Sequence, residues 1–147
     1  MGNPCAVIGV GQTEYRTRRR DVSIAGLVRE AAQRALEDAG LTWADIDAVV
    51  IGKAPDLFEG VMMPEAYLAD ALGATGKPMM RVHTAGSVGG STAIVAAGLI
   101  HSGVHERVLT VAWEKQSESN ATWALTIESP HNAYLVVGAG GYFAQHI

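Results

Sequence analysis

Residues 79–98 have the sequence MMRVHTAGSVGGSTAIVAAG, in which a short apolar run leads into a glycine-rich turn and then into small residues. This order predicts a strand over Met79 to His83, a tight turn, and a helix that runs to about Gly103. Strands and helices that alternate in this way are typical of an α/β protein with a parallel sheet.

Within residues 79–98, the turn is the part that could bind a ligand or take part in a reaction. Its glycines permit positive φ or close backbone approach, and Ser87 or Ser91 can cap the helix. The free N–H groups and the positive dipole end of the helix would then face outward, where they can hold an anion, a developing oxyanion or a nucleophile. Gly and Ser are also ordinary turn residues, so a plain strand–helix connection is the alternative. The candidate oxyanion turn comprises Gly86, Ser87, Val88, Gly89 and Gly90.

The rest of the chain repeats the α/β pattern. Ser23 and Gly40 bracket a helix over 23–39 whose apolar residues recur at helical spacing. A short helix over Pro64 to Leu72, closed by Gly73, is also expected. Three further apolar runs predict buried strands, over residues 5–10, 45–52 and 107–113. The loops over 13–22 and 53–63 connect these elements.

The composition and net charge limit the classes of function that the chain can have. The chain has 147 residues, 48% of them hydrophobic, and a net charge of −4, so we expect one packed domain and no nucleic-acid partner. The run Arg16 to Arg20 either contacts phosphates of a ligand or is a solvated loop. Cys5 is the only cysteine and is expected to be a buried thiol, and the five histidines show no metal-ligand spacing. No signal peptide and no run of about 20 apolar residues is found, so no membrane partner and a cytoplasmic location are expected.

Several side chains are candidates for a site. His83, directly before the turn, is either a proton-transfer group or a hydrogen-bonded structural residue. Met62 and Met63, in the loop after a strand, line a pocket or pack against a partner. Glu114 and Lys115 are expected to be ion-paired structural residues. Two candidates lie later in the chain: Asn120 as a pocket contact or part of a solvated loop, and Tyr142 as a pocket wall or a core residue.

The end of the sequence differs from the rest. Residues 125–147 include Gly138 to Gly141 and then the start of a helix, and the chain ends there without a capping residue. We therefore expect the sequence to be part of something longer.

These motifs, taken in order, resemble the amino-terminal half of the thiolase superfamily. The matching residues are Val7 to Gly11 with Thr13 and Tyr15, Ile46 to Val50, Thr84 to Ala93, Ile100 to Gly103, and Arg107 to Leu109 leading to Trp113 to Lys115. Within that superfamily the chain is most similar to the lipid-transfer-protein (sterol-carrier-protein) thiolases. The resemblance implies a thiolase-like α/β domain over 1–124, with a mostly parallel mixed sheet and helices on both faces. It makes 125–147 the start of the family's loop region.

One departure from the family changes the expected chemistry. Thiolases carry a reactive cysteine at the start of the buried helix, and counting back from Glu114 places that position on Gly86. Family members with a Gly-Ser-Val-Gly-Gly turn resemble the aldolase branch of steroid side-chain breakdown, which cleaves a 3-hydroxyacyl-CoA by retro-aldol chemistry. The resemblance thus implies a coenzyme A thioester as substrate and no bound cofactor. It also implies a homodimer that pairs through Met80 to Thr84, or a hetero-oligomer with a small partner protein or the missing carboxyl-terminal half.

Three functions are weighed: two follow from this resemblance, and the third belongs to another class. The first is a carbon–carbon lyase that needs a base and N–H donors rather than a thiol, with Ser87 able to donate to the thioester oxygen. The second is a conventional acyl-CoA acyltransferase in which Ser87 would be the nucleophile. The third is a non-catalytic lipid-binding subunit of a larger complex. The fragment alone is expected to be inactive.

Overall fold

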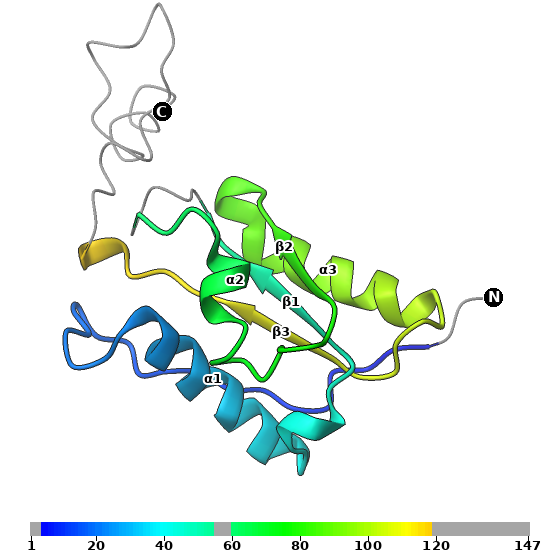
Figure 1. Ribbon diagram of the computed structural model, residues 1–147. Coiled ribbons are helices and arrows are strands. Elements are labelled where there is room, and N and C mark those ends of the chain that lie inside the picture. The colour runs from blue at the N-terminus through cyan, green and yellow to red at the C-terminus, as the bar shows by residue number, and fades with distance from the viewer. Residues whose placement is uncertain (1–3, 55–59, 119–147) are drawn as a thin grey trace, which may run out of the picture.

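The computed structural model describes residues 4–54 and 60–118 as three parallel strands with helices on both faces (Figure 1). In chain order these are α1 (Ile24–Ala39), β1 (Ala48–Gly52), α2 (Pro64–Leu68), β2 (Met79–Val82), α3 (Val88–His101) and β3 (Val108–Ala112). Short 3-10 turns lie at Trp43–Asp45, Ala85–Ser87 and Gln116–Glu118. The α/β class and the helices predicted over 23–39 and in the second half of 79–98 are confirmed. The helix predicted over 64–72 begins at Pro64 as expected but ends at Leu68.

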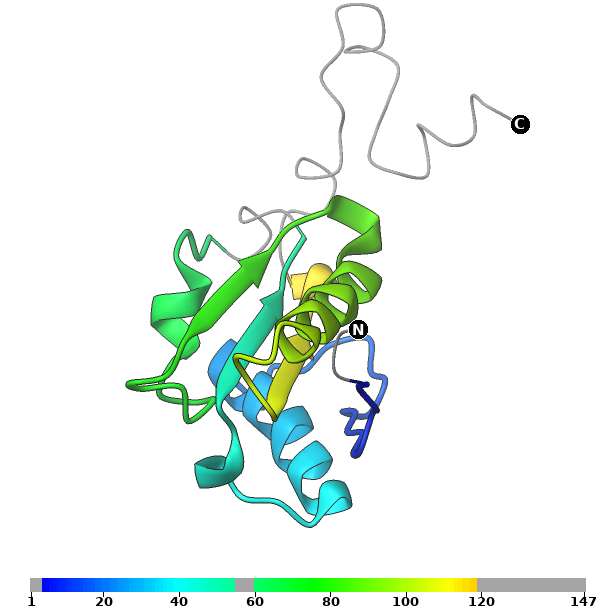
Figure 2. The same ribbon diagram turned by 90° about the vertical axis from the view of Figure 1, so that its right-hand side faces the viewer.

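The strand order is β2-β1-β3, with both pairs parallel. Val50 of β1 lies opposite Met80 and Thr110, and Gly52 lies opposite Val82 and Ala112. Because β2 and β3 flank β1, crossovers of the same hand place α2 and α3 on opposite faces of the sheet. Figure 2 shows the strands pointing toward the end where α3 begins. The mixed character expected of the sheet is not seen among the described strands.

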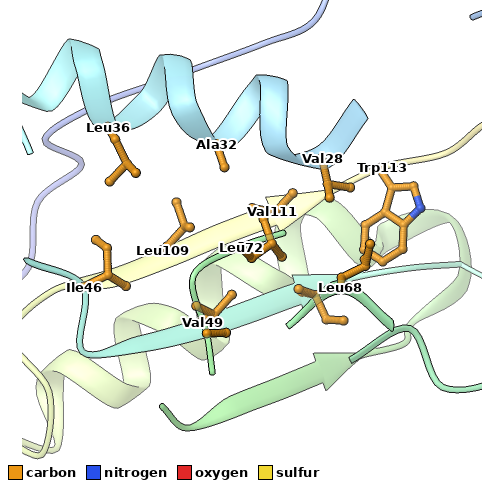
Figure 3. Close-up of a cluster of buried hydrophobic side chains, with 12 residues drawn as sticks. Val28, Ala32, Leu36, Ile46, Val49, Leu68, Leu72, Leu109, Val111 and Trp113 are labelled. Atoms are coloured by element: carbon orange, nitrogen blue, oxygen red, sulfur yellow. The ribbon is translucent and has the colours of Figure 1, made fainter. Parts of the chain in front are cut away.

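Helix α1 forms where its sequence signals predict. The Ser23 hydroxyl accepts the Gly26 N–H at 3.0 Å, and Gly40 ends the helix at φ +67°. Its buried face packs on the sheet (Figure 3). The core there comprises Val28, Ala32, Leu36, Ile46, Val49, Ile51, Leu68, Leu72, Ala74, Leu109, Val111 and Trp113. A second cluster of Val50, Val82 and Ala96 lies on the α3 face.

The strand predicted over residues 5–10 is wrong. This segment is extended but pairs with no described strand, and Val7 is 83% exposed. It runs beside α1, so closely that a Cβ on Gly9 would lie 2.4 Å from the Ala35 carbonyl oxygen. The Val10 N–H is bonded to the Asp38 carboxylate at 2.9 Å instead of a strand. Cys5, expected to be buried, is exposed because an apolar run becomes a buried strand only where a partner covers it.

Helix α3 is also less buried than the sequence suggests. Within the described residues its buried side chains are Thr92 and Ala96, which face the sheet. Ile94, on another face of the helix, is 74% exposed. The resemblance implied a buried helix here, and the part of the chain that the structure describes covers only one face of it. Among the helices that the structure describes, none has the length and apolar character needed to cross a membrane.

Candidate functional site

The carboxyl ends of the three strands meet at one edge of the sheet. Lys53 follows β1, His83 follows β2, and Trp113 and Glu114 follow β3. Because the strands are parallel and Gly52 is in register with both neighbours, these residues form one row. Open α/β sheets bind ligands outside this edge, so the candidate site is placed here.

The turn between β2 and α3 is closed by its own hydroxyls. The Ser87 hydroxyl donates to the Thr84 carbonyl oxygen at 2.8 Å, and the Thr84 hydroxyl donates to Ser91 Oγ at 2.8 Å. Neither serine caps α3 with its side chain: Ser87 makes no capping bond, and Ser91 lies inside the helix. The expected serine cap is therefore wrong, because both hydroxyls are used within the turn.

The predicted role of the glycines is wrong as well. Gly86, Gly89 and Gly90 have no positive φ, and a Cβ at any of them would meet nothing within 4 Å. The residue with left-handed backbone is Ala85, at φ +47°. A non-glycine residue in this region marks strain, and it directly precedes the position where the family's nucleophile was expected. The glycines instead leave the start of α3 open to approach from outside.

His83 is exposed at the mouth of this turn. The structure gives its ring no hydrogen bond to any residue that it describes, so the structural alternative for His83 is not seen there. Met62 and Met63 are exposed, and Arg81 of β2 donates to the Met62 carbonyl oxygen at 3.2 Å. Asn120 and Tyr142 lie outside the described residues, as does the domain boundary at 124.

Close packing behind the turn depends on Gly52, which sequence reasoning missed. A Cβ on Gly52 would lie 2.3 Å from Thr92 Oγ1 and 3.2 Å from the Ala112 side chain. Thr92 is buried, and its hydroxyl donates to the Val88 carbonyl oxygen at 2.7 Å. The first turn of α3 therefore rests directly on the ends of β1 and β3. A glycine that ends an apolar strand was the available signal.

Lys53 and Glu114 form an ion pair at the same edge. The Lys53 side chain is 1% exposed, its Nζ lies 2.6 Å from Glu114 Oε2, and the Ala54 N–H donates to Glu114 Oε1 at 2.9 Å. The ammonium also lies 5.9 Å from the centre of the Trp113 ring. The predicted ion-paired role of Glu114 is confirmed, but its partner is Lys53, which the sequence did not single out. A partner 61 residues away leaves no local pattern.

Lys115 joins the end of β3 to the arginine-rich loop. Its ammonium lies 3.0 Å from Glu118 and donates to the carbonyl oxygens of Arg19 and Val22 at 2.8 and 2.7 Å. The backbone N–H of Arg19 donates in turn to Glu118, and this bond, ahead of the bond from Lys115, holds the pKa of Glu118 below its ordinary value. The loop is therefore docked on the protein, and the prediction of a freely solvated loop is wrong for its Arg19 end.

A cavity lies between this loop and the end of β3. It encloses about 730 Å³ and is lined by residues 12–19, by Leu27, Val28 and Ala31 of α1, and by residues 111–118. Trp113 lines it, is 8% exposed, and has a buried Nε1 without a hydrogen-bond partner in the described part of the chain. Leaving a buried N–H unbonded costs about 1–3 kcal/mol, so an acceptor is expected there.

In the described ranges no three His, Cys, Asp or Glu residues are grouped so that they could hold a metal ion. The chemistry that the edge offers is therefore that of N–H donors at the start of α3, an imidazole, hydroxyls and one buried ion pair. Such groups can hold an anion and move a proton.

The chain is similar to proteins that share one fold. A family model described as the thiolase N-terminal domain matches residues 5–134. An acetyl-CoA acetyltransferase of Methanothermobacter thermautotrophicus is 35% identical over 114 residues, which cover 77% of this chain and 30% of the relative. Human (Homo sapiens) sterol carrier protein 2 is 29% identical over 116 residues, which cover 78% of this chain and 21% of the relative.

A solved structure has the same fold, and its chain is also much longer than this one. The Ltp2-ChsH2(DUF35) aldolase superposes with a TM-score of 0.60 at 26% identity, covering 88% of this chain and 31% of that one. The chain thus spans about a third or less of the length of each of these proteins.

Proposed function

The chain belongs to the thiolase family, and on this premise we propose that the protein acts on an acyl-CoA thioester and cleaves a carbon–carbon bond β to it. The members to which it is similar include an acetyl-CoA acetyltransferase and an aldolase. Between these two reactions the residues of the turn favour the second.

The observation that carries the proposal is the position of the only cysteine. Cys5 lies in a pocket with Leu41, Ile100 and Val108, where β3 begins. The turn at Gly86 follows the end of β2, and in a parallel sheet these are opposite ends. No thiol of this chain is therefore available at the open turn to form an acyl-cysteine.

A retro-aldol reaction needs no such thiol. A base takes the proton from the 3-hydroxyl group, and the oxygen's electrons form a carbonyl as the bond between carbons 2 and 3 breaks. The released electron pair forms an enolate on the thioester, which is then protonated to a shortened acyl-CoA. His83 is the proposed proton-transfer group of this chain, and the N–H groups at the start of α3 are the proposed donors to the enolate oxygen. Ser87 would join them as a donor when its hydroxyl turns from the Thr84 carbonyl oxygen to the enolate.

Acyl transfer is the second candidate, favoured by the similarity to an acetyl-CoA acetyltransferase. Ser87 would then be the nucleophile. Its hydroxyl donates to the Thr84 carbonyl oxygen, an acceptor that does not remove its proton, so this geometry does not activate it. Full transfer activity in a Ser87→Ala variant would remove this candidate.

The proposal includes an assembled enzyme. β2 lies at the edge of the described sheet, and Met80 within it is exposed, which suits the strand pairing across a dimer axis that the family resemblance implies. A small partner protein, or residues that correspond to the rest of the relatives' length, would complete a hetero-oligomer. We propose a cytoplasmic location for it, with no bound cofactor.

The test is a product assay by mass spectrometry on the full-length protein with its partner subunits. The substrate is a 3-hydroxyacyl-CoA that carries a bulky ring system. A ketone or aldehyde together with a shortened acyl-CoA is the expected result. A covalent acyl adduct and thiolysis products would contradict the lyase, and binding without turnover would favour a non-catalytic lipid-binding subunit.

A further inference from the structure

The ion pair between Lys53 and Glu114 lies directly behind the support of α3. The first turn of α3 rests on the register pair Gly52 and Ala112, at the ends of β1 and β3. Lys53 follows Gly52, and Glu114 lies two residues after Ala112. Because side chains alternate along a strand, Lys53 lies on the face of Ile51, which is the α1 face, and not on the α3 face. The pair therefore joins the two supporting strands from behind.

The same pair also connects to β2. The backbone N–H of Lys53 donates to the Val82 carbonyl oxygen at 3.3 Å, directly before His83. Glu114 holds the Lys53 ammonium at 2.6 Å with one carboxylate oxygen and accepts the Ala54 N–H at 2.9 Å with the other. The ends of all three strands are thus joined through Lys53 and Glu114. Both the proposed proton-transfer group and the proposed N–H donors follow strand ends that belong to this linked row.

Stability alone does not account for a buried ammonium at this place. Taking Lys53 and Glu114 out of water costs free energy, and apolar side chains of similar size often stabilise a protein as well or better. The opposite ends of β1 and β3 are linked without a buried charge: there the exposed Asp47 carboxylate accepts the N–H groups of Glu106 and Arg107. The buried pair stands instead at the edge where the reaction is proposed, and buried charges at such an edge are candidates for a functional role.

We propose that Lys53 and Glu114 are positioning residues, whose ion pair sets the distance between the His83 imidazole and the N–H donors at the start of α3. The inference rests on the proposed function, because that function gives these two groups their roles. Neither residue of the pair touches the substrate: they act through Val82 on one side and Gly52 on the other. A displacement of about 1 Å between reacting groups can lower a rate by about a hundredfold. Loss of the pair should therefore lower kcat more than it raises KM.

The test uses the double variant Lys53→Met with Glu114→Gln in the full-length protein with its partner subunits. This variant removes the buried ammonium together with its partner, and the new amide oxygen can still accept the Ala54 N–H, so the fold should be kept. Steady-state kinetics are measured with the 3-hydroxyacyl-CoA that carries a bulky ring system. We expect kcat to fall by about tenfold or more, with KM changed by about twofold or less.

Asp47→Asn is the matched control, because Asp47 links the same two strands at their other ends. We expect it to leave kcat and KM unchanged. A double variant with the kcat of the unaltered protein would overturn the inference and leave the proposed function standing. An equal fall of kcat in the double variant and in Asp47→Asn would also overturn it, because the effect would then be one of stability and not of position.

A second measurement does not depend on turnover. Amide hydrogen exchange, followed by mass spectrometry, reports how firmly residues 84–95 are held, with residues 24–39 of α1 as the internal reference. We expect exchange over 84–95 to become several-fold faster in the double variant and to stay unchanged in Asp47→Asn. Unchanged exchange in the double variant would overturn the inference. If the unaltered protein shows no turnover, the proposed function fails, and the exchange result still decides whether the pair holds the turn.

Discussion

At the scale of single residues, Gly52 decides how closely α3 approaches the sheet. A methyl group there would meet Thr92 Oγ1 at 2.3 Å, and Thr92 is buried and bonded to Val88, so it has little room to move. We predict that Gly52→Ala lowers the free energy of unfolding by about 1–3 kcal/mol, as overpacking does in other cores. Urea denaturation of the purified protein measures this.

Gly98 provides the matched control for Gly52. It lies inside α3, has no positive φ, and a Cβ there would meet nothing within 4 Å. Gly98→Ala should therefore leave stability unchanged or raise it by up to about 1 kcal/mol, because alanine favours the helix. Equal losses in the two variants would show that the close approach at Gly52 is not what matters.

The hydrogen bonds of Asp47 should make the free energy of unfolding depend on pH. Its carboxylate accepts the N–H groups of Arg107 at 2.8 Å and Glu106 at 3.0 Å, and these bonds, Arg107 first, hold the pKa of Asp47 below its ordinary value. The stabilisation is complete above the unfolded pKa of about 3.9 and is lost as pH falls through the lower folded value.

We therefore expect Asp47→Asn to lower stability at pH 7 by about 1 kcal/mol or less, since the site is exposed. The difference from the unaltered protein should shrink below pH 4, where the native carboxyl is protonated too. Urea denaturation from pH 3 to 7 checks this, with the exposed Asp70→Asn as the control. A difference that stays constant with pH would contradict the assignment.

At the scale of elements, the Lys53–Glu114 pair links the ends of β1 and β3. We predict a coupling energy of about 1–3 kcal/mol in a double-mutant cycle of Lys53→Met and Glu114→Gln, because the ammonium is buried. Denaturation of the two single variants and the double variant measures it. Strictly additive losses would mean that the two side chains stabilise the edge independently.

Lys115 likewise links the end of β3 to the loop that contains Arg16 to Arg20. Its replacement should change how readily a protease cuts that loop. The Arg16 to Arg20 run is a natural trypsin site that Lys115 holds against the end of β3 through two carbonyl oxygens. Lys115→Met should increase the rate of tryptic cleavage in this run several-fold, since loosening an anchored loop favours local opening. Lys77→Met, which removes a bond to the Trp43 carbonyl oxygen instead, should not do so.

At the scale of the whole molecule, features that depend on neighbouring residues could be predicted from the sequence, whereas features that depend on distant partners could not. The bounds of α1 followed from Ser23 and Gly40 because caps are written within a few residues of the helix ends. The prediction of a strand over 5–10 was wrong because an apolar segment does not reveal whether another strand lies beside it to pair with. Gly52 and Lys53 were missed for a related reason: their partners, Thr92 and Glu114, are neighbours only after folding.

The same reasoning predicts where the described domain is incomplete on its surface. Ile94 of α3 is 74% exposed, and Val104 beyond the end of α3 is 72% exposed. If the enzyme is assembled as proposed, α3 is covered in the assembly, and Ile94→Asp then places a charge in an apolar contact. We predict that this variant lowers the melting temperature of the assembled full-length protein by several degrees and weakens its assembly. Ala44→Asp, at an exposed position in the turn Trp43–Asp45, is the control and should change the melting temperature less. Differential scanning calorimetry and size-exclusion chromatography measure the two effects. An unchanged melting temperature and elution volume for Ile94→Asp would mean that α3 faces solvent in the assembled protein, and the proposed assembly would then have to form through β2 alone.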